Sequence, residues 1–140
     1  MSGGLGRMRD IGAALKTVLG VSPQNNAGSA INGPAIDRTG FESCVLSAMA
    51  GSTTGSPTSF TVDAKLQESA DGSTGWADIS GAAISALTAV DTEGDVDIDL
   101  SGVKKFVRAV VTPAFVGGTS PTVDVAATVV LGGAQEVPAA

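Results

Sequence analysis

Alternation of apolar and polar side chains is the main pattern in the second two-thirds of the chain. Within residues 58–69, every second residue from Phe60 to Leu66 is apolar, and the residues between them are polar or charged. Residues 95–100 alternate in the same way, with Asp95, Asp97 and Asp99 at the polar positions. A period of two residues is that of a β-strand with one buried face. Both segments are therefore predicted to be strands.

Turn-forming clusters divide this pattern into short strands spaced roughly ten residues apart. The dipeptide Asp71-Gly72, which is typical of tight turns, predicts a hairpin between 58–69 and the residues from Trp76 onward. Strands are predicted over 41–50, 58–69, 76–79, 83–89, 95–100, 106–112 and 122–131. Because no convincing helix lies between them, the body is predicted to be an all-β sandwich or barrel.

Residues 1–38 differ from the rest of the chain in charge and composition. They hold four basic and two acidic residues, a net charge of +2, whereas 39–140 holds four basic and twelve acidic residues, a net charge of −8. Apolar residues within 8–19 recur at roughly helical spacing, and 21–34 is rich in Asn, Gly, Ser and Pro, which is typical of linkers. We therefore expect an extended arm over 1–38, with a short helix at about 8–19, that becomes ordered on a partner.

The rest of the chain is predicted to consist of a body and a tail. The β-rich body is predicted over 39–133, and the Gly-, Ala- and Pro-rich residues 134–140 are expected to form a loose C-terminal tail. A length of 140 residues fits one such domain. The core is expected to be thin, because the chain holds 21 Ala and 19 Gly but only one Trp and no Tyr. Stabilisation by partner subunits is therefore expected.

Composition excludes several classes of function. The chain has no His, so an imidazole base, a His-containing triad and a His metal site are all excluded. The single Cys44 excludes an internal disulfide and a multi-Cys metal site, and its apolar surroundings predict a buried, unreactive thiol. A net charge of −6 argues against nucleic acid as a partner, and no apolar run approaches the roughly 18 residues of a membrane span. The protein is predicted not to be an enzyme and to need no cofactor.

Two local features are candidates for binding. Asp95, Asp97 and Asp99 could offer oxygen ligands to a cation, but the spacing is not that of a calcium loop, so a solvated strand face is favoured. Whether this strand holds a cation stays open. Trp76 could stack on a sugar or anchor an interface, and the favoured interpretation is a core residue that caps one end of the sandwich.

Five stretches of the chain resemble small capsid cement (decoration) proteins of tailed bacteriophages. They are 32–41 (NGPAIDRTGF), 63–72 (DAKLQESADG) running into Trp76, 106–111 (FVRAVV), 117–121 (GGTSP) and 129–133 (VVLGG). The resemblance covers about 31–133, and the stretch from Lys65 through Trp76 is its most specific part. It implies a jelly-roll body on the outer surface of the virion, bound at seams between major capsid protein subunits and usually acting as a homo-oligomer.

These observations lead to one main hypothesis about the interactions of the chain. Residues 6–38 would strap across the major capsid protein, with apolar and charged anchors at Arg7, Arg9, Ile11, Leu15, Val18, Ile36 and Arg38. The body would associate with a second copy, as a dimer, through apolar area that its small core cannot hide. Dimer versus trimer, the symmetry axes occupied and the identity of the phage stay open. No nucleic acid and no membrane are expected as partners.

Two alternatives belong to other classes of function. A carbohydrate-binding jelly-roll module of a virion or secreted protein would expose Trp76, and binding to host-surface glycans stays open at this point. A tail-tube or pilin-like subunit would assemble into filaments by itself. An enzyme has the least support, because the sequence carries no motif for catalysis.

Overall fold

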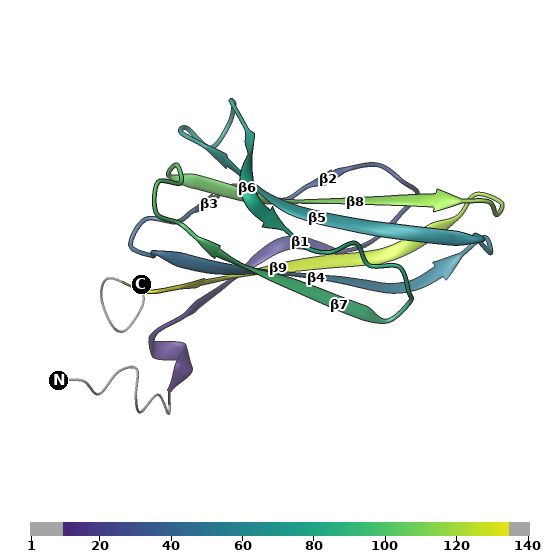
Figure 1. Ribbon diagram of the computed structural model, residues 1–140, viewed down its shortest axis with the longest axis horizontal. Coiled ribbons are helices and arrows are strands. Elements are labelled where there is room, and N and C mark those ends of the chain that lie inside the picture. Colours follow the sequence, from purple (N-terminus) through teal and green to yellow (C-terminus); the bar gives the residue numbers. More distant parts are fainter. Residues whose placement is uncertain (1–9, 135–140) are drawn as a thin grey trace.

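The chain folds as two antiparallel β-sheets packed face to face, which confirms the predicted all-β sandwich (Figure 1). The computed structural model describes residues 10–134. The elements are η1 (Ile11–Ala13), β1 (Lys16–Asn26), β2 (Ile31–Asn32), β3 (Ile36–Asp37), β4 (Ser43–Thr54), β5 (Ser59–Ser69), β6 (Ala77–Ala83), β7 (Thr92–Asp99), β8 (Phe106–Val116) and β9 (Thr122–Gly132). Within this part of the chain, no helix has the length and apolarity needed to cross a membrane.

The connectivity is jelly-roll-like. Sheet A has the strand order β1-β9-β4-β7, and sheet B has the order β2-β8-β5-β6, with the short β3 also paired to β8. Apart from the β5–β6 hairpin and the short strands β2 and β3, which both pair with β8, consecutive strands lie in opposite sheets. The chain therefore crosses between the layers repeatedly. This arrangement confirms the fold that the cement-protein resemblance implies.

Alternation along the long strands builds the core. In β5 the predicted apolar face, from Phe60 to Leu66, points inward and is buried. The even-numbered residues of β4 and the odd-numbered residues of β9 do the same, and Leu46, Leu66 and Leu131 have no exposed surface. The core therefore consists mainly of Val, Leu and Ala side chains, as the composition predicted.

The N-terminal segment is where the structure departs most from the expectation. Only η1 is helical within 10–19, so the short helix predicted at about 8–19 is wrong for the described residues. Instead β1 pairs with β9 from Lys16↔Leu131 to Asn26↔Val123 and forms an edge of sheet A. A short isolated helix is marginal in water, whereas pairing satisfies the exposed edge of β9. Residues 16–37 are thus part of the sandwich and not a separate arm.

Other predicted strand boundaries also change: 41–50 becomes Ser43–Thr54, 76–79 becomes Ala77–Ala83, and 95–100 becomes Thr92–Asp99. Residues 83–89 do not form a strand after the end of β6, and only Leu87 makes an isolated bridge, to Val62. Pro113 does not end β8, which continues to Val116. Opposite Pro113, the Val62 N–H donates to the Leu87 carbonyl (2.8 Å) and points away from β8. Val62 and Pro113 are thus a non-hydrogen-bonded pair of the β5–β8 ladder, in which both nitrogens point away from the partner strand. The missing N–H of Pro113 therefore costs no hydrogen bond between β5 and β8. Of the predicted tail, 135–140 lies outside the described residues.

A close approach of two glycines joins the sheets at the β1 edge. The Gly33 N–H donates to the Ala109 carbonyl of β8 (2.8 Å). A Cβ atom on Gly33 would lie 1.8 Å from the carbonyl oxygen of Gly20 in β1 and 3.2 Å from that of Ala109. Only glycine fits at position 33 without moving one of these backbones.

Substitution of Gly33→Ala is therefore expected to lower the free energy of unfolding by about 1–3 kcal/mol, the usual cost of forcing extra volume into a packed site. Gly12→Ala serves as the control, because its Cβ would meet only the Asp10 carboxylate, at an ordinary 3.5 Å. Urea unfolding followed by circular dichroism measures both variants. Equal midpoints for the native chain and Gly33→Ala would contradict this description of the β1 edge.

The β5–β6 turn is held by the carboxylate of Asp71. Its oxygens accept hydrogen bonds from the Ser73 N–H (2.8 Å), the Thr74 N–H (2.8 Å), the Thr74 hydroxyl (2.7 Å) and the Ser69 hydroxyl (3.0 Å). These bonds, led by the one from the Thr74 N–H, hold the pKa of Asp71 far below its usual range. The hairpin predicted from Asp71-Gly72 is confirmed, with Gly72 at a φ of 77°.

Substitution of Asp71→Asn is expected to lower the urea midpoint at neutral pH, because an amide oxygen accepts these hydrogen bonds more weakly than a carboxylate. The stabilisation from the low pKa is fully present above the ordinary aspartate pKa of about 3.9 and decreases as the pH falls toward the folded-state pKa. The difference between variant and native chain should therefore shrink below about pH 4. Urea titrations across this range measure it, with Asp63→Asn as an exposed control. A pH-independent difference would contradict the assignment.

Candidate interaction surface on sheet A

The residues predicted as capsid anchors do not form one group. Arg7 and Arg9 lie outside the described residues. Ile11 is 59% exposed, whereas Leu15 and Val18 are half-buried, and Val18 packs against the core. Ile36 is buried in the core, at 5% exposure. The hypothesis of a strap that uses all seven side chains therefore loses Ile36, which packs within its own chain.

Arg38 is also engaged within the sandwich. Its guanidinium donates hydrogen bonds to the carbonyl oxygens of Lys104 (3.3 Å), Phe41 (3.3 Å) and Val103. These contacts tie the segment after β3 to the loop before β8. Arg38, predicted as a charged anchor for a partner, thus stabilises its own fold, which the sequence around it did not indicate.

The outer face of sheet A combines an apolar strip with a row of carboxylates. In the register of the sheet, Val45 of β4 lies between Val130 of β9 and Asp97 of β7. The row of Met49 repeats this order with Ala126 and Glu93. The row between them is polar on β4 and β9, with Ser47 and Thr128, and Leu19 of β1, 52% exposed, lies beside Thr128 on the far side of β9. We define the apolar strip as Leu19, Val45, Met49, Ala126 and Val130, and the acidic ridge as Glu93, Asp95, Asp97 and Asp99.

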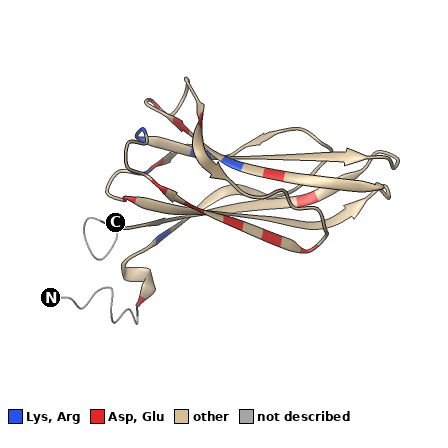
Figure 2. Cartoon of the chain, in the orientation of Figure 1, with Lys and Arg blue, Asp and Glu red and all other residues tan. Residues whose placement is uncertain are grey.

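The acidic ridge lies along an edge strand. All four of its residues are exposed at alternate positions of β7, and Figure 2 shows separate red segments along this strand. The Glu93 carboxylate accepts a hydrogen bond from the Ser47 hydroxyl (2.9 Å), and that of Asp99 accepts one from the Ser101 N–H (2.9 Å). Alternate residues of a strand are roughly 7 Å apart, and within 10–134 no three acidic or thiol side chains come together as metal ligands. The ridge is a solvated face that also discourages pairing at this edge.

No positive charge balances the ridge within its own sheet. Strands β4, β7 and β9 contain no Lys or Arg at all, and β1 contains only Lys16, its first residue. Asp124 of β9 adds a fifth exposed carboxylate to the outer face. Most of the excess negative charge on the described residues of the sheets is therefore gathered on one side of the sandwich.

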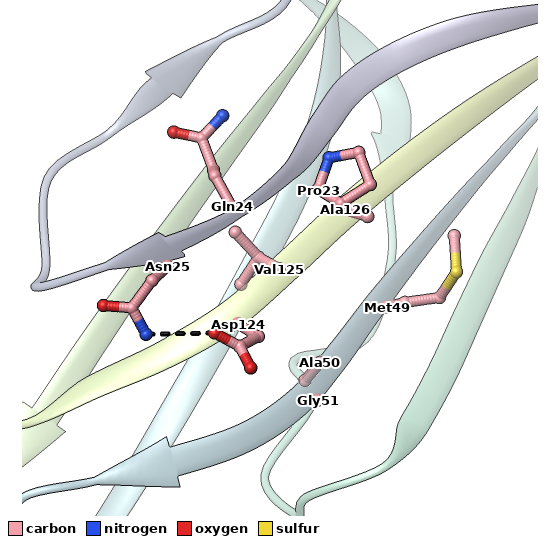
Figure 3. A pocket seen from close by; sticks show the side chains of 9 residues that line it. All are labelled: Pro23, Gln24, Asn25, Met49, Ala50, Gly51, Asp124, Val125 and Ala126. Atoms are coloured by element: carbon pink, nitrogen blue, oxygen red, sulfur yellow. Dashed lines mark hydrogen bonds between the residues drawn. The ribbon is translucent and has the colours of Figure 1, made fainter.

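Two shallow hollows lie on this same face. One, of about 430 Å³, opens where β1 loses regular pairing with β9 between Val21 and Gln24, and Pro23, Met49 and Ala126 contribute to its lining (Figure 3). The Asn25 amide donates to the Asp124 carboxylate (3.0 Å) at its edge. The second, of about 540 Å³, lies at the other end of the strip and includes side chains of Leu15, Val45, Asp97 and Val130. The face is thus uneven and not a flat sheet surface.

The outer face of sheet B is organised differently. The Arg108 guanidinium lies over the Trp76 ring, 4.4 Å from its centroid, and its Nε donates to Gln67 Oε1 (2.9 Å). Gln67 and Lys65 both donate to the Asp78 carboxylate, at 2.9 Å and 3.0 Å. The hydrogen bond from Gln67, followed by that from Lys65, lowers the pKa of Asp78. Arg108, Gln67, Lys65 and Asp78 on this face are thus linked to one another.

This network corrects the interpretation of Trp76. The ring is half-buried and lies outside the core cluster, so the prediction of a core residue is wrong. Because the hairpin brings Trp76 back over β8, an arginine covers one face of the indole. That face is unavailable as a sugar platform.

Cys44 behaves as predicted. It is buried at 3% exposure on the inward side of β4. Burial raises the pKa of its thiol to about 11. The thiol is therefore protonated and unreactive at neutral pH.

Comparison with known proteins identifies the fold and not a family. The sequence matches no known family and no curated protein. Among solved structures, the SPBc2 prophage-derived protein YomS superposes with a TM-score of 0.51 at 15% identity, over 84% of this chain and 91% of that one. A chain from the structure of the infectious bursal disease virus Gx strain superposes with a TM-score of 0.52 at 11% identity, over 89% of this chain. This chain covers 34% of that viral chain. At these identities the likeness establishes a shared sandwich fold.

Proposed function

We propose that the protein is a structural component of a viral particle, and more specifically a bacteriophage capsid cement protein. It binds the outer surface of the assembled shell and clamps neighbouring major capsid protein subunits. The observation that supports this most is the jelly-roll-like sandwich, which is shared with a prophage-derived protein and a viral chain. The sequence resemblance to cement proteins over about 31–133 supports the finer assignment.

The three carboxyls with a lowered pKa are held by local structural contacts. Asp37 is held by hydrogen bonds from Thr39, Asp71 by its own turn, and Asp78 by Gln67 and Lys65. Each lowered pKa is thus explained by a local structural contact, whereas a catalytic acid or base needs a pKa near the working pH. By contrast, the outer face of sheet A is a surface whose exposed carboxylates form no salt bridge among the described residues.

A rigid sandwich is well suited to clamping. A protein that binds only the assembled shell stabilises that shell by mass action, by about 2.7 kcal/mol per site at a free concentration 100 times the Kd. Because the strands are already ordered by their own core, little conformational entropy is lost on binding. Many copies on one lattice add their contributions. Self-association as a dimer and a location on the outer surface of the virion are parts of the same proposal.

The proposal is tested with particles of the virus that encodes this chain. We expect the chain in purified particles, and we expect particles without it to release their genome at a temperature several degrees lower. Purified chain added back should restore the native release temperature, because binding shifts the equilibrium toward the intact shell. Absence of the chain from particles, or identical release temperatures with and without it, would rule out a cement function.

A further inference from the structure

The two outer faces of the sandwich differ in whether their charged side chains contact partners on the same face. On sheet B, the cations Lys65 and Arg108 contact Asp78, Gln67 and Trp76. On sheet A, the acidic ridge faces solvent beside the apolar strip, and none of its carboxylates forms a salt bridge within 10–134. Apolar side chains bordered by charge, here interspersed with Ser47 and Thr128, are typical of a protein interface.

The geometry of the strip fits a macromolecular partner better than a small ligand. Its side chains come from β1, β9 and β4, three neighbouring strands that lie roughly 5 Å apart. A hollow of about 430 Å³ lies at one end and one of about 540 Å³ at the other. Side chains of a docking surface could fill both hollows at once, which would fix its orientation on the sheet.

The charge of the face determines which partner can bind. In a face-to-face dimer, each acidic ridge would have to lie against a copy of the same face. The strands of that face offer Lys16 alone as a cation against five exposed carboxylates, Glu93, Asp95, Asp97, Asp99 and Asp124. Like charges across an interface are unfavourable. A second copy therefore does not fit, whereas a surface that carries Lys or Arg does.

We infer that the outer face of sheet A is the docking surface of this protein, and that its partner is a protein surface with an apolar centre bordered by Lys or Arg side chains that face the acidic ridge. The inference rests on the proposed function, in which that partner belongs to the capsid shell. The apolar strip supplies contact area, and the ridge sets orientation and speeds association.

Binding of purified chain to particles that lack it, measured by co-sedimentation, tests the inference. Asp95→Asn combined with Asp97→Asn removes two ridge charges and leaves the hydrogen-bonded Glu93 and Asp99 intact. Affinity is expected to fall about tenfold, since each exposed ion pair contributes up to about 1 kcal/mol. Raising the salt concentration from about 0.1 M to about 1 M should weaken the native chain more than this variant, because the Debye length falls from about 10 Å to about 3 Å.

Leu19→Gln tests the apolar strip separately. Leu19 is 52% exposed, so the change should leave the fold intact and weaken binding about fivefold through the loss of apolar contact area. Two matched controls lie on sheet B. Asp63→Asn removes an exposed carboxylate of β5, and Val116→Gln removes a valine of β8 that is 62% exposed. Both are expected to bind within about twofold of the native chain.

Each outcome distinguishes the inference from the proposed function. If the sheet A variants bind with the affinity of the native chain, whatever the affinity of the controls, the docking surface is overturned and the cement function still stands. Failure of the native chain itself to bind would overturn the cement function and the inference with it. A solution dimer that Leu19→Gln dissociates, measured by sedimentation velocity, would show that a second copy covers this face and would also overturn the inference.

Discussion

Pairing of β9 on both sides is the interaction on which the rest of the sandwich depends. β9 lies between β1 and β4, so the two ends of the described chain pair at one edge of sheet A. The register across this pairing puts Val129 and Leu131 into the core and Thr128 and Val130 on the outer face. Without β1, β9 would present an unpaired edge, and the close contact between Gly20 and Gly33 would be lost. Pairing with the N-terminal strand β1 is therefore needed to form the outer face of sheet A, the surface that is proposed to bind a partner.

The thin core has a consequence for the exterior. Inward positions are filled mainly by Val, Leu and Ala, and Phe41 and Phe60 are the aromatic residues within the core cluster of the described chain. Each such side chain buries less area than an aromatic one, so the stabilisation gained per residue is small. Apolar side chains on the outer face of sheet A, including Val45 and Val130, can gain further burial only against another molecule. This agrees with a protein that works as part of a larger assembly.

Electrostatics give the molecule two distinct sides. On sheet B, Lys65 pairs with Asp78, and Arg108 contacts the uncharged Gln67 and Trp76. On sheet A, β7 places its carboxylates in a row at the edge, and the neighbouring strand β4 carries no charge of either sign. An exposed ion pair contributes little to folding, so the difference between the faces bears more on recognition than on stability. A protein with one such face can bind in a single orientation.

Local pattern by itself was enough to predict β5 and β7 from their alternation, β4, β8 and β9 as β-rich runs, and the turn at Asp71. Side-chain period and turn chemistry act over a few neighbouring residues. The buried thiol of Cys44 also follows from its apolar run. Tertiary structure alone decided the conformation of 16–26, which the sequence divides between a predicted helix at about 8–19 and a linker over 21–34. Its backbone pairs instead with β9, about a hundred residues later. Tertiary structure also placed Trp76 on Arg108, buried Ile36, and put the carboxylates of β7 beside the apolar residues of β4 and β9. These outcomes depend on contacts between segments distant in the chain, which no local periodicity encodes.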